Sequence, residues 1–425
     1  MDEKSTSRAN NVSASNDTEH VTDDRRIEDP PDGGVGWLQV LVAHLTLFNN
    51  FGYFNSFGIF EQYYSTRLGL DLSALSWTGS IQVFLLLGIG IFTGRLFDAG
   101  YFRSLVVAGS VLQLLGTFMT SLATSYWQIF LAQGLATGIG AGLMYCPIMA
   151  NVSTYFDKKR ALAIALVTSG TATGGVVYPV IAQQLLSKAG FEWTVRCMGF
   201  VMLFNFAIII VFARRRLPPR PSGPLLELDA FKELPYTLFS VGIFLSLWAV
   251  YIGYTYINHY GVAVVGIDSS TSLSLLLILN ALGCPGRIIP ALISDAFTGP
   301  FQTVLPLVFS SGILYFGWMG IRSWASLLAF AVLFGFVNGG VQGMLMAGLP
   351  SLTTDLGKMG TRTGMILSIA SVATLTGPPV AGALIEAGDG RYTYLQIWGG
   401  CSMIVSACFL LGASLTRRLK VDIST

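Results

Sequence analysis

The chain is built from apolar runs of about 20 residues, and this pattern constrains its fold more than any other feature of the sequence. A run of that length can cross a bilayer as an α-helix, because a helix satisfies its own backbone hydrogen bonds in lipid. The composition agrees, since 52% of the 425 residues are hydrophobic and 11% are charged. These values are too apolar for a soluble domain and predict an all-α membrane protein.

Twelve such runs are present, so we expect twelve transmembrane helices. Their approximate cores are residues 37–60, 75–97, 104–123, 127–150, 161–186, 195–213, 235–256, 272–294, 302–320, 324–346, 363–385 and 394–415.

Polar segments divide the chain further. Residues 1–31 are polar and nearly free of aromatic side chains, which is typical of a disordered tail, and they lack the apolar core of a signal peptide. A basic, proline-rich linker at 214–233 separates two groups of six runs. We therefore expect six-helix bundles at 32–213 and 234–416, followed by a short tail at 417–425.

Basic side chains gather in alternate loops and orient the expected bundle. One set of loops holds fourteen Lys and Arg residues, and the opposite set holds five. Because Lys and Arg accumulate in cytoplasmic loops, we expect the richer set on the cytoplasmic side. An even number of spans then places both termini, including the N-terminal tail, in the cytoplasm. The plasma membrane is the expected location, although a vacuolar membrane would give the same pattern.

An internal repeat relates the two groups of runs. Asp98 closes the second run and Asp295 closes the eighth, 197 residues later. Pro147 and Pro350 follow glycine-rich stretches in step, 203 residues apart. A repeat in parallel orientation predicts two pseudo-symmetric six-helix bundles.

Glycines recur at helical spacing in two runs. Gly134, Gly138 and Gly142 share one face of the fourth run, and Gly170 and Gly174 share one face of the fifth. Small residues on one face let two helices approach closely. The pattern predicts close helix contacts there, as suits a bundle that rocks between two openings.

The two-half plan, with an acidic residue at the end of the second and eighth runs, resembles the major facilitator superfamily. Within it, "DGGVGWLQV" (32–40) and "YFDKKRALA" (155–163) resemble two signatures of the monocarboxylate porter family. The stretch "GRLFDAGYFR" (94–103) resembles the loop motif of the superfamily, with Ala99 replacing its usual basic residue, and "NSFGIFEQYY" (55–64) is similar to the fungal branch. The resemblance implies the major facilitator fold and transport by alternating access.

Four charged residues at the expected cytoplasmic ends of the spans are candidate gating residues. Asp98 and Arg103, with Arg95 one turn before Asp98, can form charge pairs that lock the two halves in one state and release them in another. Asp295 holds the repeat-related place in the second half. The alternative is an ordinary cluster of charges at a loop end.

Arg287 lies inside the eighth run. A guanidinium within a membrane span is costly and normally faces a partner or a hydrated cavity. The resemblance implies that Arg287 contacts the carboxylate of the substrate, for which the arginine fork offers two parallel hydrogen bonds. The alternatives are snorkelling to the cytoplasmic surface and pairing with Asp295.

Two positions depart from the pattern of the porter family. Gly283 stands where the family has an aspartate four residues before the arginine, and Asn55 stands where it has a lysine. Simple symport of lactate with a proton needs those charges. The remaining titratable side chains, Glu61 and His259 among them, are expected near the membrane edges.

The expected cavity is therefore lined by amides, hydroxyls and aromatic rings around one arginine. The candidate substrate-binding residues are Arg287, Asn55, Asn280, Tyr53, Tyr178, Tyr254 and Asn338. Further candidates in the same runs are Asn49, Asn50, Tyr145, Tyr256 and Gln342. Each has an alternative role as a polar contact between helices. Such a lining suits a larger amphipathic molecule with a weakly acidic or carbonyl-rich group better than lactate.

These observations predict a secondary active or facilitative transporter that exports a small amphipathic organic acid or secondary metabolite. Uptake of a monocarboxylate or vitamin-like solute, and a non-transporting receptor of the same fold, are the alternatives. The sequence has no catalytic cluster, metal-ligand spacing or phosphate-binding loop, so we expect no enzyme, metal or cofactor. Its charges form no basic patch, which argues against nucleic acid as a partner. We expect a monomer in the lipid bilayer with a small-molecule substrate.

Overall fold

The computed structural model describes residues 32–69, 72–220, 223–353 and 355–424, and every regular element in these ranges is helical. The first half contains α1 (Val35–Asn55), α2 (Phe57–Leu68), α3 (Leu72–Gly88), α4 (Gly90–Asp98), α5 (Phe102–Thr120), α6 (Tyr126–Ile129), η1 (Phe130–Ala136), α7 (Thr137–Tyr155) and α8 (Arg160–Phe212). The second half contains η2 (Leu228–Lys232), α9 (Leu234–Tyr260), η3 (Gly261–Val265), α10 (Ser269–Ile293), η4 (Ser294–Thr298), α11 (Pro300–Trp318), α12 (Trp324–Gly348), η5 (Leu349–Leu352), η6 (Leu356–Lys358), α13 (Met359–Ala387) and α14 (Thr393–Ser424).

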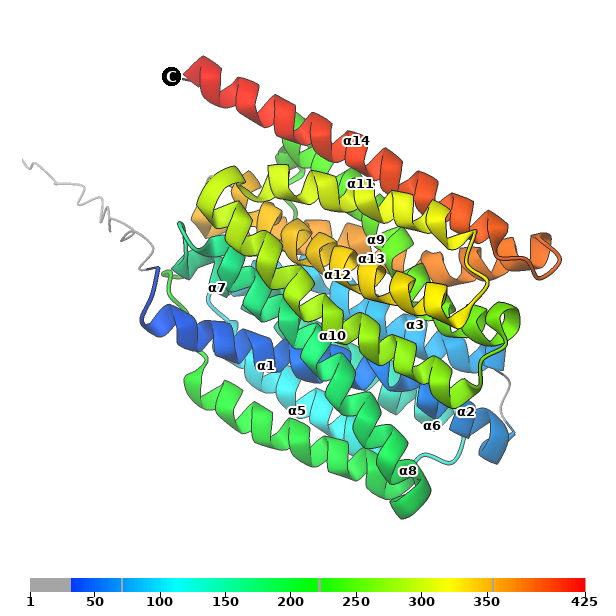
Figure 1. Cartoon of the computed structure of the whole chain (residues 1–425). Helices are drawn as coiled ribbons and strands as arrows, with labels where there is room; N and C mark the ends of the chain where they lie inside the picture. Colours follow the sequence, from blue (N-terminus) through cyan, green and yellow to red (C-terminus); the bar gives the residue numbers. More distant parts are fainter. Residues whose placement is uncertain (1–31, 70–71, 221–222, 354, 425) are drawn as a thin grey trace, which may run out of the picture.

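Ten helical segments in the described ranges are long and apolar enough to cross a membrane. One of them, α8, has 53 residues and would be about 80 Å long as a single helix, whereas the hydrocarbon core is about 30 Å thick. Gly190 interrupts α8 with φ 78° and ψ 171°, and the ribbon turns back there (Figure 1). The expected fifth and sixth spans lie on either side of Gly190. With α1 as the first crossing, the fold has the twelve spans that the sequence predicts.

The glycine faces predicted from the sequence are places where neighbouring helices come very close. Gly138 and Gly142 face α3, and a methyl group on Gly142 would lie 2.5 Å from the backbone oxygen of Leu85. Gly174 faces α1, where a methyl group would lie 2.2 Å from the backbone oxygen of Phe48. No side chain fits at such distances, so the predicted close contacts are confirmed.

The two halves meet along two seams. At one seam α10 packs against α8, and at the other α13 packs against α3 and α4. Gly94 of α4 and Gly360 of α13 are so close that a methyl group on Gly94 would lie 2.1 Å from the Gly360 oxygen. We call this end of the bundle, where α4 ends and α13 begins, the closed end. The start of α1 and the end of α14 lie at one end of the bundle (Figure 1).

Three segments were expected outside the helical bundles. Residues 1–31, the expected disordered tail, lie outside the described residues. The described part of the 214–233 linker is irregular as far as the short helix η2. In the expected tail at 417–425, the described residues continue α14 to Ser424, because nothing in the sequence after the last apolar run stops the helix.

The contact between α1 and α8 predicts the effect of a substitution at Gly174. Gly174→Val would press two methyl groups into the backbone of α1 and should destabilise the protein by about 1–3 kcal/mol, as overpacking of a tight core does. The measurement is the thermal unfolding midpoint of the purified full-length chain. Gly317→Ala is the matched control, because a methyl group at Gly317 meets no atom within 4 Å. Equal midpoints for the two variants would contradict the packing argument.

Candidate functional site

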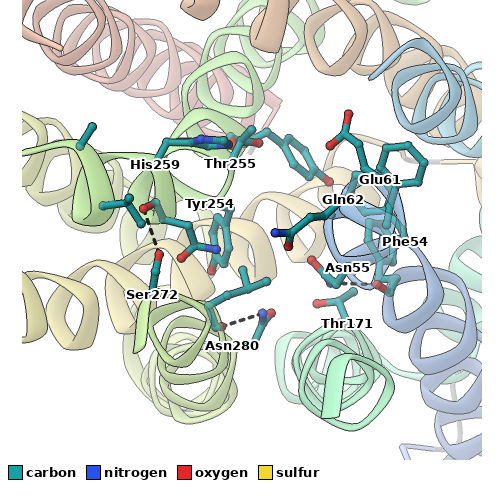
Figure 2. Close-up of a pocket in the computed structure, with 18 of the residues that line it drawn as sticks. Phe54, Asn55, Glu61, Gln62, Thr171, Tyr254, Thr255, His259, Ser272 and Asn280 are labelled. Atoms are coloured by element: carbon teal, nitrogen blue, oxygen red, sulfur yellow. Dashed lines mark hydrogen bonds between the residues drawn. The ribbon is translucent and has the colours of Figure 1, made fainter. Parts of the chain in front are cut away.

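A cavity of about 700 Å³ lies between the two halves. Its walls come from α1, α2 and α8 of the first half and from α9, α10 and α12 of the second. Figure 2 shows Tyr254 and Asn280 on one side, facing Asn55 and Thr171 on the other. The lining combines aromatic rings with amides and hydroxyls, and it includes the charged side chains of Arg287 and Glu61. Such a mixture suits an amphipathic small molecule.

Arg287 is held inside the protein by neutral oxygen atoms. It is 2% exposed and lines the cavity. Its Nη1 donates to the backbone oxygen of Gly283 at 2.9 Å, and its Nη2 donates to Thr171 Oγ1 at 2.9 Å and to Gln342 Oε1 at 3.1 Å. Its Nε has no hydrogen-bond partner in the structure. The side chain therefore neither snorkels to a surface nor pairs with Asp295.

Gly283 explains how this arginine folds back along its own helix. A methyl group on Gly283 would lie 2.7 Å from Arg287 Nη1. The guanidinium thus occupies the space that a side chain at position 283 would need. The glycine at this position therefore has a direct structural consequence. Where the porter pattern has an aspartate beside the arginine, Arg287 donates to the backbone carbonyl of Gly283.

Three other candidates also line the cavity, namely Asn55, Asn280 and Tyr254. The amide nitrogens of Asn55 and Asn280 each donate to the carbonyl four residues earlier, at 2.8 Å from Phe51 O and 3.0 Å from Leu276 O. This bond directs the amide oxygen away from its own helix. The Asn280 oxygen lies against α8, where a methyl group on Gly175 would be 2.7 Å from it.

Tyr53, Tyr178 and Asn338 are not among the residues that line the cavity, and their contact with the substrate stays a prediction. The Tyr178 hydroxyl donates to Asn49 Oδ1 at 2.9 Å, within the first half. Asn338 accepts from Ser311 Oγ at 3.0 Å and donates to the backbone of its own helix α12. Tyr53 is completely buried. These side chains have the alternative role of polar contacts and packing between helices.

The sequence interpretation missed several lining residues. Thr171 and Tyr251 lie in apolar stretches and carry no motif. Glu61 was expected near a membrane edge and was not expected to line the cavity, but α2 brings its carboxylate into the cavity wall, where Ser76 Oγ donates to it at 2.8 Å. The sequence signal for the break between α1 and α2 is weak, because Ser56 and the nearby Gly58 also occur inside many helices.

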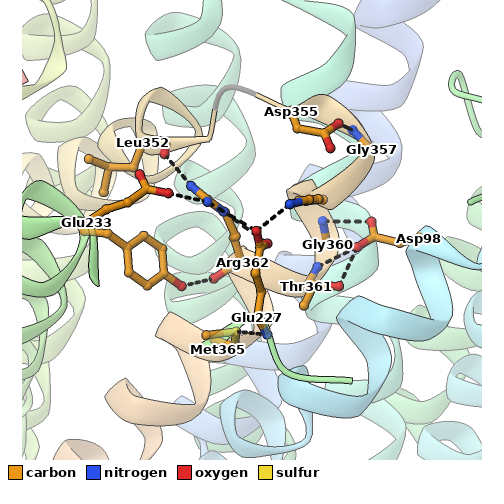
Figure 3. Close-up of polar contacts among 12 residues, drawn as sticks. Asp98, Glu227, Glu233, Leu352, Asp355, Gly357, Gly360, Thr361, Arg362 and Met365 are labelled. Atoms are coloured by element: carbon orange, nitrogen blue, oxygen red, sulfur yellow. Dashed lines mark hydrogen bonds and ion pairs between the residues drawn. The ribbon is translucent and has the colours of Figure 1, made fainter. Parts of the chain in front are cut away.

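Asp98 joins the two halves at the closed end. Its carboxylate accepts from the backbone nitrogens of Gly360 and Thr361, at 2.9 and 2.8 Å, and from the Thr361 hydroxyl at 2.7 Å (Figure 3). These nitrogens belong to the first turn of α13, where unpaired N–H groups and the helix dipole favour an anion. The carboxylate of α4 therefore caps a helix of the opposite half.

Asp295 repeats this arrangement from the other half. Its carboxylate accepts from the backbone nitrogens of Ala161 and Leu162, at 3.0 and 2.8 Å, in the first turn of α8. Each half thus contributes an acidic residue that caps a helix of the other, in agreement with the sequence repeat.

The expected charge pair between Asp98 and Arg103 is replaced by these caps in the contacts that the structure describes. Arg103 is exposed. Arg95 donates to the backbone oxygens of Arg220 and Gly223 in the linker. The physical reason is that the N-terminus of α13 lies against Asp98 and supplies three hydrogen-bond donors. The carboxylate is therefore satisfied without Arg103.

A network of ion pairs lies beside the Asp98 cap (Figure 3). Glu227 accepts from Lys358 Nζ at 2.6 Å and from Arg362 Nε at 3.3 Å, and Arg362 also pairs with Glu233 at 2.6 Å. Burial raises the pKa of Glu227, but the hydrogen bonds from Lys358 and Arg362 outweigh it and hold the pKa below its ordinary value. The linker is therefore tied to the start of α13 over the neutral pH range.

Two bundles with a polar cavity between them, sealed at one end by reciprocal helix caps, form the architecture of a membrane transporter. The chain belongs to the Major Facilitator Superfamily, whose family model matches residues 42–359. The match is to the superfamily, and the resemblance to monocarboxylate porters stays a prediction.

Curated relatives and solved structures agree with this assignment. An MFS-type transporter of Gibberella zeae is 42% identical over 92% of this chain and 89% of its own length. A protein of Emericella nidulans named an aspyridones efflux protein is 35% identical over 91% of this chain and 79% of its own. The crystal structure of the human organic anion transporter MFSD10 has a TM-score of 0.73 at 17% identity and covers 89% of this chain and 100% of that one. At that identity the likeness supports the fold alone.

The Asp98 cap predicts how the closed end opens. In Asp98→Asn, an amide NH₂ replaces one acceptor oxygen and faces backbone donors, so closure should weaken by about 1–3 kcal/mol. Cys146 is a built-in reporter, because its buried Sγ lies 3.7 Å from the Gly360 oxygen. Its alkylation by N-ethylmaleimide should accelerate in a chain whose other cysteines are replaced.

Two further variants control this measurement. Asp295→Asn should accelerate the alkylation similarly, because both caps close the same end, and Thr361→Val should have a smaller effect because it removes one bond of three. Unchanged alkylation of Cys146 in both aspartate variants would show that the caps do not hold this end closed.

Proposed function

We propose that the protein exports a small amphipathic organic acid or a secondary metabolite with an acidic group. The observation that carries the proposal is Arg287, a buried guanidinium in the cavity whose contacts are all to neutral oxygens. A carboxylate or enolate would supply the missing negative charge through charge-assisted hydrogen bonds. The efflux protein among the relatives supports the direction.

The cavity favours a cargo larger than lactate. Its volume of about 700 Å³ lies in the usual range for sites that hold drug-sized molecules. Phe51, Phe54 and Phe57 lie along α1 and α2, and Tyr251 and Tyr254 lie along α9, so an extended apolar or aromatic body has rings on both sides. Asn55, Asn280 and Gln342 would bind carbonyl or hydroxyl groups of the cargo.

Orientation follows from the basic loops. The closed end contains the basic segments 158–160 and 214–216, so the positive-inside rule assigns it to the cytoplasm together with both chain ends. In this assignment the cavity opens to the outside, and the structure is an outward-open state. We propose the plasma membrane as the location and a monomer as the working unit, with bundles at 32–213 and 234–416 moving about the two seams.

Transport then proceeds by alternating access, in which the cytoplasmic end opens as the outer end closes, and the reverse. The caps of Asp98 and Asp295 hold the cytoplasmic end shut, and both must break when that end opens to load cargo. The close glycine contact between α4 and α13 re-forms when it shuts. Arg95 and Arg103 act at the same end, Arg95 through the linker carbonyls.

Glu61 supports a second candidate, uptake of a monocarboxylate together with a proton. Its carboxylate shares the cavity with Arg287. An anion on Arg287 would be repelled by ionised Glu61 and accepted more readily by the protonated form. Proton-coupled uptake requires acidification of the vesicle interior that follows the cargo, whereas anion export driven by the membrane potential does not.

The proposal predicts the behaviour of Arg287→Ala. Transport of radiolabelled aromatic carboxylates by vesicles should fall at least tenfold, because the guanidinium that lines the cavity is lost, while transport of the corresponding uncharged amides should change little. Arg287→Lys keeps the charge without the fork and should show intermediate carboxylate transport. Normal carboxylate transport by the alanine variant would remove Arg287 from the mechanism, and an intact chain without any flux would favour a receptor.

A further inference from the structure

The bond between Arg287 and Thr171 crosses from one half of the protein to the other. Arg287 belongs to α10 in the second half, and Thr171 belongs to α8 in the first. Their atoms Nη2 and Oγ1 are 2.9 Å apart, and both side chains line the cavity. Gln342, the other partner of Nη2, lies on α12 in the same half as Arg287.

The stereochemistry of the guanidinium limits how a carboxylate can reach it. Its five N–H groups offer two bidentate edges, one through Nε and Nη2 and the other through Nη1 and Nη2. Both edges use an Nη2 hydrogen. Nη2 has two hydrogens, and Thr171 and Gln342 accept one each. A carboxylate that binds with both oxygens must therefore displace one of these two acceptors.

Thr171 is the acceptor that can be released at smaller cost. Its hydroxyl donates its own hydrogen to the Thr168 backbone oxygen at 2.8 Å and keeps that bond when Arg287 leaves. The same bond turns an oxygen lone pair towards Arg287, which explains why the hydroxyl acts as an acceptor there. Thr171 is also partly exposed to the cavity, so water can replace the arginine.

We propose that Thr171 is a positioning residue that occupies Nη2 of Arg287 in the empty carrier and is displaced by the acidic group of the cargo. This inference rests on the proposed function. Displacement breaks a link between the halves in mid-cavity, so cargo binding weakens the outward-open state directly. A bidentate acid breaks the link, whereas a group with one acceptor atom does not need both N–H groups of an edge and can leave the link intact.

The bond to Thr171 also explains how the buried charge of Arg287 is stabilised in a carrier without cargo. A buried guanidinium without hydrogen-bond acceptors is costly in a membrane. Thr171 stands in for the cargo after release, and the neutral hydroxyl binds weakly enough to be exchanged for the next anion.

The test measures the conformational equilibrium of the full chain without any cargo. Spin labels at Ser65→Cys and Val262→Cys, both at the cavity wall, report the opening by their distance distribution in a background free of native cysteines. Thr171→Val should lower the population with an open cavity, relative to the population with a closed cavity, about fivefold. This change corresponds to about 1 kcal/mol for one hydrogen bond. Thr171→Ser keeps the hydroxyl and should match the unaltered protein.

Thr168→Val is the matched control on the same helix. The Thr168 hydroxyl donates to the Ala165 backbone oxygen at 3.2 Å, within α8, so its loss should leave the cargo-free distribution unchanged. Adding benzoate should shift the unaltered protein towards the closed population and shift Thr171→Val much less, because its link is already absent. Benzamide should not shift either protein.

Identical distributions for Thr171→Val and the unaltered protein would overturn the inference. That result would leave the proposed function standing if Arg287→Ala still loses carboxylate transport. Normal transport by Arg287→Ala together with a shifted Thr171→Val distribution would instead overturn the proposed function and the role of the cargo, because the link would then be structural only.

Discussion

A buried positive charge with only neutral partners is the constraint on which the centre of this protein depends. Arg287 is 2% exposed, and the oxygens that hold it come from three helices, α8, α10 and α12. A guanidinium at this depth persists only where several elements bring acceptors to it or a cavity brings water. Because α8 belongs to one half and α10 and α12 belong to the other, the hydrogen bonds of this one side chain connect the two halves at the cavity.

At the closed end, two negative charges are stabilised across the halves in a related way. Asp98 and Asp295 each lie at the end of a helix and are satisfied by the N–H groups of a helix start in the opposite half. A helix start offers several donors and a favourable dipole in fixed positions, so the cap also fixes how the halves dock. The repeat in the sequence thus appears in the structure as a repeated cap, not as a repeated ion pair.

Hydropathy and glycine spacing predicted the fold well, because the length of an apolar run and the face of a helix are local properties. The site was predicted in part, since polarity alone does not give the rotation of a helix. Tyr53 and Asn55 are two residues apart, or about 200° around α1, so Asn55 lines the cavity while Tyr53 is buried elsewhere. Glu61 was missed as a lining residue for another reason: α2 continues along the cavity after the break at Ser56.

The position of Glu61 bears on the two departures from the porter pattern, at Gly283 and Asn55. In the porter pattern the carboxylate sits on the same helix as the arginine, so the two charges move together. Here the carboxylate comes from α2 of the first half and the guanidinium from α10 of the second. Any motion of one half against the other therefore changes the distance between this carboxylate and the guanidinium, whereas a carboxylate on α10 would keep its place beside Arg287.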